Sequence, residues 1–150
     1  MNRRLFTSGL AALPALLAAG STSAAPNKGA AGSDATRAAQ MISAIRRAAG
    51  LPAVSVDSRM TAAADYQARS VAAAGSLSHG DFASRVRSFG IGGSALAENL
   101  AYGADDVAGA VAQWQASAPH QANLLLPGAR RIGLGRADNG RTRYWALVIG

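Results

Sequence analysis

The sequence predicts an α+β domain in which helices cover a small antiparallel sheet. Four segments between residues 34 and 118 repeat apolar residues at helical spacing. Beyond residue 131 the spacing changes, and Ile132 and Leu134 alternate with Gly133 and Gly135. The run Asp138-Asn139-Gly140 is typical of a tight hairpin turn between two strands. The predicted order is therefore helices first and an antiparallel hairpin last.

Capping residues set the expected boundaries of the helices, since Ser and Asp side chains accept hydrogen bonds from the first free N–H groups. Gly50, Gly75 and Pro119 mark the ends of three of the four helices. Short extended pieces are expected at residues 51–56 and 98–102. The predicted caps are Ser33 or Asp34, Asp57 or Ser58, Asp81, and Asp105 or Asp106.

Composition excludes several classes of function. The chain has 150 residues, a net charge of +7 and no cysteine, which excludes a disulfide scaffold, a cysteine-ligated zinc site and a thiol nucleophile. The arginines are scattered and not interleaved with aromatic residues, so no nucleic acid partner is expected. The positive charge favours contact with anionic surfaces.

Residues 1–25 are predicted to be a signal peptide. Basic Arg3-Arg4 precedes an apolar run from Leu5 to Leu17, and small residues lead to a cleavage site near Ala25. The run is shorter than the about 20 residues that a spanning helix needs, so no stable transmembrane anchor is expected, although an uncleaved N-terminal anchor is an alternative. Either the Sec or the Tat route would export the protein to the periplasm or the medium. Residues 26–33 are expected to form a flexible leader, and residues 34–150 the folded domain.

Few residues could carry chemistry in this chain. It has two histidines, His79 and His120, and one glutamate, Glu98. Each falls at the boundary of a predicted element. These three residues are therefore the first candidates for a functional site.

In their order and local context these residues resemble the CAP superfamily of cysteine-rich secretory proteins, antigen 5 and pathogenesis-related proteins, most closely its bacterial secreted branch. The resemblance covers residues 36–150 and implies an α-β-α sandwich. Five short motifs carry it: Ser78-His79, Glu98-Asn99, the segment from Trp114 to Leu125, the segment from Ile132 to Gly135, and Tyr144-Trp145.

The resemblance also implies a cleft lined by two histidines and two acidic residues, which binds a divalent metal in several members. His79, Glu98 and His120 match three of the four positions, and Ser117 stands at the second acidic position. Asn99 corresponds to a residue that helps to fix the cleft, although local capping of the backbone is equally possible. Two imidazoles and a carboxylate would suit Zn²⁺ with one open position.

Two alternatives remain open for these residues. Glu98 could instead be a buried carboxylate bonded to His79 or to backbone N–H groups, because a buried charge needs a partner. Ser117 and His120, three residues apart, could form an activated serine, but local hydrogen bonding of Ser117 at a helix end is favoured.

The function expected is that of an exported, monomeric, non-enzymatic module that binds a divalent metal or an unidentified small ligand. A metal-dependent hydrolase acting on peptides or cell-wall material is an alternative, weakened by the lack of H-E-x-x-H and of a paired acid. A third possibility is an envelope adhesion or structural domain with a vestigial cleft, whose arginines contact an anionic envelope component.

Overall fold

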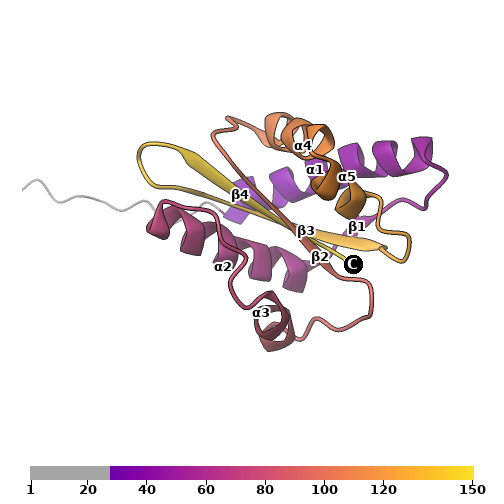
Figure 1. Cartoon of the computed structure of the whole chain (residues 1–150), viewed down its shortest axis with the longest axis horizontal. Helices are drawn as coiled ribbons and strands as arrows, with labels where there is room; N and C mark the ends of the chain where they lie inside the picture. Colours follow the sequence, from indigo (N-terminus) through magenta and orange to yellow (C-terminus); the bar gives the residue numbers. More distant parts are fainter. Residues whose placement is uncertain (1–27) are drawn as a thin grey trace, which may run out of the picture.

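The protein is an α-β-α sandwich, with a four-stranded sheet between two helical layers (Figure 1). The computed structural model describes residues 28–150. Helices α1, α4 and α5 lie on one side of the sheet, and α2 and α3 lie on the other. The predicted fold class is therefore confirmed. In chain order the elements are α1 (Lys28–Ala48), β1 (Ser55–Val56), α2 (Ser58–Ala74), α3 (Phe82–Ser88), β2 (Ala97–Tyr102), α4 (Val107–Ala116), α5 (Ala118–Leu124), β3 (Arg131–Asp138) and β4 (Arg143–Ile149).

The sheet is mixed rather than purely antiparallel. Its strand order is β1-β3-β4-β2, and β4 pairs antiparallel with both β3 and β2. The segment expected as an extended link forms the two-residue strand β1, which pairs in parallel with β3. A strand of two residues is too short to show alternating hydrophobicity, and the residues that it pairs with lie far along the chain. The sequence therefore did not predict this strand. This pairing makes β1 one edge of the sheet and β2 the other.

The core has two parts because β4 points alternate side chains to opposite faces of the sheet. Trp145, Leu147 and Ile149 pack toward α1 and α4, and they are fully buried. Ala146 and Val148 pack toward α2. Both faces of β4 are thus covered, which explains its continuous apolar sequence.

Helix α2 rests directly on two glycines of β3. A Cβ at Gly133 would lie 2.0 Å from backbone atoms of Met60 and Thr61, and one at Gly135 would lie 2.3 Å from the backbone nitrogen of Asp65. No side chain fits into that space. The alternation of Ile132 and Leu134 with glycine therefore fixes the distance between the helix and the sheet.

Three predicted caps and two predicted helix ends, at Gly50 and Gly75, are confirmed. Asp57 Oδ1 accepts the backbone N–H groups of Arg59 and Met60 at 2.8 and 3.0 Å. Asp81 and Asp106 cap α3 and α4 in the same way. After α2, Gly75 adopts a left-handed conformation with φ 67°.

Two helix boundaries differ from the prediction. Helix α1 begins at Lys28, so residues 28–33 are helical where a flexible leader was expected. The Thr36 hydroxyl donates to the Gly32 carbonyl oxygen at 2.9 Å, which connects this segment to the next turn of the helix. Helix α4 ends at Ala116, and Pro119 lies in the first turn of a further helix, α5, where proline is tolerated because its missing N–H would have no partner.

The predicted signal peptide, residues 1–25, lies outside the described residues. Between residues 28 and 150, no helix is both long enough and apolar enough to cross a membrane.

Candidate functional site

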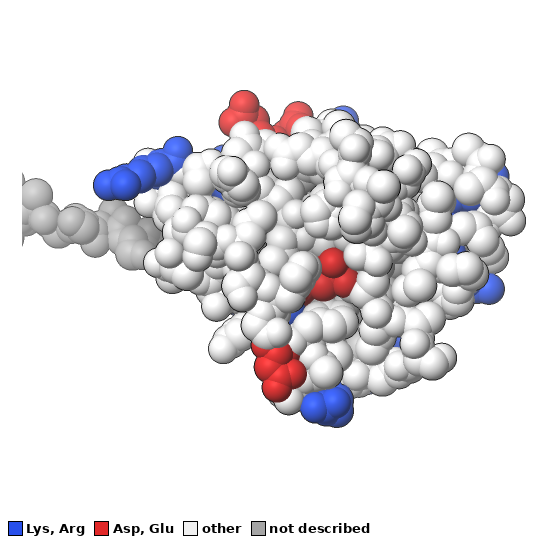
Figure 2. Space-filling view, viewed as in Figure 1, with Lys and Arg blue, Asp and Glu red and all other residues white. Residues whose placement is uncertain are grey.

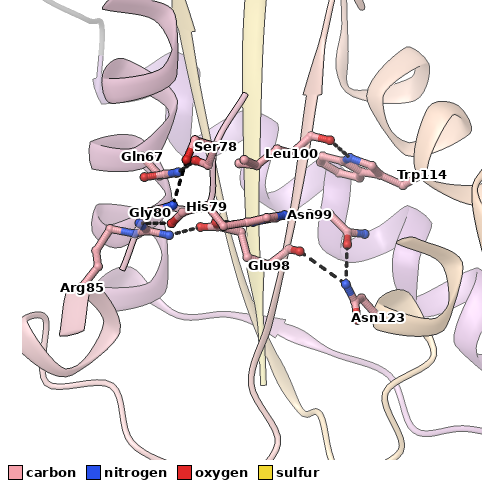
Figure 3. Close-up of polar contacts among 10 residues, drawn as sticks. All are labelled: Gln67, Ser78, His79, Gly80, Arg85, Glu98, Asn99, Leu100, Trp114 and Asn123. Carbon is pink, nitrogen blue, oxygen red and sulfur yellow. Dashed lines mark hydrogen bonds and ion pairs between the residues drawn. The ribbon is translucent and has the colours of Figure 1, made fainter. Parts of the chain in front are cut away.

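The candidate site surrounds β2 at the edge of the sheet. Successive side chains of a strand point to opposite faces, and Glu98 and Asn99 follow this rule. Glu98 contacts the loop before α3 and α3 itself, whereas Asn99 contacts α5 (Figure 3). In the space-filling view of this face, most of the surface is uncharged and acidic atoms lie in a hollow near its middle (Figure 2).

Glu98 is the centre of an ionic cluster that also contains His79 and Arg85. Its side chain is only 2% exposed. Glu98 Oε1 lies 2.8 Å from His79 Nδ1, and Oε2 forms an ion pair with Arg85 Nη2. An ionised carboxylate can only accept hydrogen bonds, so Nδ1 carries the proton. In the uncharged form of this tautomer the lone pair lies on Nε2, and the His79 side chain is 56% exposed.

Neighbouring contacts hold the backbone of His79 as well as its ring. Arg85 Nη1 donates to the His79 carbonyl oxygen at 3.0 Å. Buried Gln67 donates from Nε2 to the carbonyl of Ser78, and the Gly80 N–H donates to Ser78 Oγ at 3.2 Å. The loop that carries His79 is therefore fixed from both α2 and α3.

On the other side of β2, Asn99, Asn123 and the backbone of His120 form an amide cluster. Asn99 is fully buried, and its Nδ2 donates to the His120 carbonyl oxygen at 3.0 Å. Asn123 Nδ2 donates to Asn99 Oδ1 at 2.8 Å and to the carbonyl oxygen of Glu98 at 3.3 Å. These bonds connect α5 to β2 and fix the position of His120. Among residues 28–150, no hydrogen bond involves the ring of His120.

The two histidines are electrostatically coupled. Partial burial lowers the pKa of His120 below its usual value, and the positive charge of a protonated His79 lowers it further. Since the usual value is about 6.5, His120 is mostly neutral at pH 7. The contacts thus place the ring of His79 against Glu98, and the backbone of His120 against Asn99, the next residue of β2.

Side chains of α4 donate hydrogen bonds to backbone carbonyl groups on the edge of β2 that does not pair with β4. Trp114 Nε1 donates to the Leu100 carbonyl at 3.0 Å, and Gln113 Nε2 donates to that of Tyr102 at 3.3 Å. Asn123 of α5 donates to the backbone carbonyl of Glu98 in the same way. An additional strand would have to displace these donors, so pairing of another chain with this edge is disfavoured.

Ser117 lies between α4 and α5, and its side chain caps neither helix. Its carbonyl oxygen accepts the Gln121 N–H at 2.8 Å. Within the described part of the chain, no hydrogen bond joins its hydroxyl to His120. The geometry therefore gives no support to an activated serine, and the local bonding of Ser117 involves only its backbone.

The residues present do not fit the three-ligand zinc site that the resemblance implies. Both carboxylate oxygens of Glu98 are occupied, one of them by a guanidinium cation that would repel a metal ion. Among residues 28–150, no group of three His, Cys, Asp or Glu side chains is placed to hold a metal. The contacts agree with the alternative in which Glu98 is a buried carboxylate bonded to His79.

Arg85, which completes the ionic cluster, was not among the site residues predicted from the sequence. The sequence nevertheless contains a pattern that indicates a buried Arg85. Arg85 lies on the same face of α3 as Phe82 and Val86, and its guanidinium lies 5.5 Å from the centre of the Phe82 ring. An arginine on the apolar face of a helix is expected to have a buried partner, and Glu98 is the only glutamate in the chain.

Comparison with known proteins identifies the family. The family model described as the cysteine-rich secretory protein family, CAP, matches residues 39–149. The chain therefore belongs to the CAP family. A search of curated proteins finds no match.

Three solved bacterial structures share the fold. An extracellular protein with an SCP domain from Bacillus anthracis is 20% identical, with a TM-score of 0.72 over 79% of this chain and 40% of its own. An outer surface protein from Borrelia burgdorferi is 18% identical, with a TM-score of 0.68 over 79% of this chain and 92% of its own. A cysteine-rich secretory protein from Staphylococcus aureus is 15% identical, with a TM-score of 0.67 over 79% of this chain and 38% of its own. The chain thus spans less than half of the first and third proteins.

Proposed function

We propose that this protein is an exported CAP domain that binds a ligand through the rings of His79 and His120, while Glu98 and Arg85 provide structural support. The observation that carries the proposal is that both oxygens of Glu98 are occupied, one by His79 Nδ1 and the other by Arg85. This arrangement directs Nε2 of His79 away from the carboxylate.

The same contacts favour a binding module over a hydrolase. A general base must reach the proton it removes, directly or through one water molecule. The Glu98 side chain is nearly fully buried, and its two oxygens contact His79 and Arg85. Catalysis by this carboxylate would require the cluster to open, whereas a ligand on the exposed ring of His79 would leave the contacts of Glu98 in place.

A neutral imidazole nitrogen accepts hydrogen bonds and binds divalent transition metals. The ligand would therefore be a metal such as Zn²⁺, held by the two histidines without direct coordination by Glu98, or a small molecule with hydrogen-bond donors. In metal sites a carboxylate commonly fixes the tautomer of a coordinating histidine, and Glu98 is placed to do this for His79.

Two observations support export to the periplasm or the medium. The first 25 residues have the pattern of a signal peptide. Two of the similar structures come from proteins described as extracellular and as an outer surface protein.

Nuclear magnetic resonance of the imidazole groups would test the proposal. The chain has only two histidines, so the ring signals can be assigned with His79→Gln and His120→Gln. On titration of the tag-free exported protein with Zn²⁺ at pH 7.5, both rings should shift with the same concentration dependence, and either substitution should weaken binding at least about tenfold.

For a small-molecule ligand, the same two signals would report binding in a fragment screen. Ligands that shift neither ring, or Zn²⁺ binding that survives both substitutions, would contradict a histidine site. Hydrolysis of peptide or cell-wall substrates that Glu98→Gln abolishes without unfolding would favour the hydrolase instead.

A further inference from the structure

A second candidate site lies at the end of the sheet where β3 begins and β4 finishes. A pocket of about 340 Å³ lies between the loop that leads from α3 to β2 and the loop before β3. The described residues that line it are all outside the histidine site: Gly92, Gly93, Ser94, Ala95, Gly128, Arg130, Arg131 and Gly150.

Glycines allow the two loops to approach each other. A Cβ at Gly128 would lie 3.0 Å from Cβ of Ala95, and one at Gly150 would lie 2.5 Å from the side chain of Leu96. The Gly150 carbonyl accepts the N–H groups of Arg130 and Arg131 at 2.9 and 2.7 Å. The backbone of both arginines is thereby fixed at the wall of the pocket.

The pocket has free hydrogen-bond donors. Within the described residues, the backbone N–H groups of Gly92, Gly93 and Ser94 have no acceptor. Arg130 uses only Nη1 for bonds to neighbouring carbonyls, and Arg131 uses only Nη1 for its ion pair with Asp57. A guanidinium has five N–H donors, so most of those on both side chains remain available.

Three arginines lie in or beside this pocket. Arg46 is fully buried and donates to the carbonyls of Leu124, Leu126 and Ala129, each at 2.9 Å; Ala129 lies between two residues that line the pocket, Gly128 and Arg130. The charge of Arg130 contributes to lowering the pKa of Arg46, after the larger effect of burial. Asp57 is the only carboxylate that forms an ion pair with these three arginines among residues 28–150. Cations, free N–H groups and a concave wall together suit an oxyanion.

We propose that this pocket binds a phosphate group, with Arg130 and Arg131 supplying charge and the amides of Gly92 to Ser94 supplying directional hydrogen bonds. The site extends the function beyond the histidine pair. It would connect the exported domain to a phosphate-bearing molecule of its surroundings.

Titration with inorganic phosphate tests this site through amide NMR signals. At constant ionic strength set with sodium chloride, the signals of residues 92–95 and 128–131 should shift together. The variant Arg130→Gln/Arg131→Gln should raise the phosphate Kd about tenfold or more, because hydrogen bonds to charged groups are the strong ones.

The control is Arg37→Gln/Arg141→Gln, which removes the same charge from two exposed arginines elsewhere. It should leave the Kd nearly unchanged. Equal weakening in both double variants, or no shift at the two loops, would overturn the site. If the Arg130/Arg131 double variant does not fold, Arg130→Gln alone provides the test, since Arg130 is exposed and bonded only to nearby carbonyls.

Vesicles containing phosphatidylglycerol distinguish the source of the phosphate. Binding that the Arg130/Arg131 variant loses and the control keeps would assign it to a lipid headgroup. Binding of inorganic phosphate without binding of vesicles would assign it to a soluble or polymeric phosphate.

Discussion

The ionic cluster and the amide cluster hold their histidines in opposite ways. His79 is fixed through its ring, which Glu98 binds, and also through its carbonyl, which Arg85 binds. His120 is fixed only through its carbonyl, which Asn99 binds, and its ring is free of described partners. One strand supports both arrangements because Glu98 and Asn99 point to opposite faces of β2.

This difference has an energetic consequence. Buried charges lose strong hydration, so removal of one partner leaves the other at a large cost. Neutral amides lose less hydration, so a broken amide contact costs less. The ionic cluster should therefore be the more sensitive half of the site, both to substitution and to rearrangement.

The largest effect is expected from Arg85→Met, which leaves the Glu98 carboxylate buried without its cation. Breaking a buried ion pair by removing one partner typically lowers the free energy of unfolding by about 3–5 kcal/mol. Urea denaturation measures this loss. Arg87→Met on the same helix is the control. Because Arg87 is exposed, this substitution should change the free energy of unfolding by about 0.5 kcal/mol or less. Similar losses in the two variants would show that the ionic cluster contributes little to the free energy of unfolding.

A smaller effect is expected from Asn99→Ala in the amide cluster. The substitution leaves the His120 carbonyl and one Asn123 donor without their partner. Unsatisfied buried polar groups cost about 1–3 kcal/mol. The same denaturation experiment checks this value, with exposed Gln115→Ala as the control. A loss larger than that of Arg85→Met would reverse the proposed order of the two clusters.

The smallest effect is expected from the pH dependence at His120. Its pKa in the folded protein is lowered by burial and by His79, so protonation favours the unfolded state. This part of the stability is intact above the usual pKa of about 6.5 and is lost as the pH falls through the folded pKa. Between pH 7.5 and 5.5, wild type should therefore lose more stability than His120→Gln. Equal losses would place His120 in fully hydrated surroundings.

The two clusters also show what the sequence could predict. Rare residue types at element boundaries were enough to select His79, Glu98 and His120, and capping and turn residues located most helices and the hairpin. Arg85 was missed because arginine is common in this chain, and its significance depends on a buried face that only the packing of α3 reveals. Helix α5 was missed because Pro119 was interpreted as a stop signal, although proline also occurs in the first turn of a helix.

The groups that contact the carboxylate oxygens of Glu98 could not be derived from the sequence either. The family resemblance suggested a metal ligand, and the spacing of the three residues along the chain carries no information about which atoms meet. The structural alternative was equally consistent with a single buried glutamate. The contacts of the two carboxylate oxygens distinguish these possibilities, because an oxygen bonded to arginine is poorly suited to bind a cation.

The tautomer of His79 tests the central claim most directly. Nitrogen-detected or long-range ¹H–¹⁵N NMR distinguishes the two ring nitrogens of the neutral imidazole. If Glu98 accepts from His79 across the 2.8 Å contact, the proton of the neutral ring lies on Nδ1 and Nε2 is bare, and Glu98→Ala removes this preference while Asn99→Ala preserves it. A proton on Nε2 of the wild-type ring would contradict the structural role of Glu98.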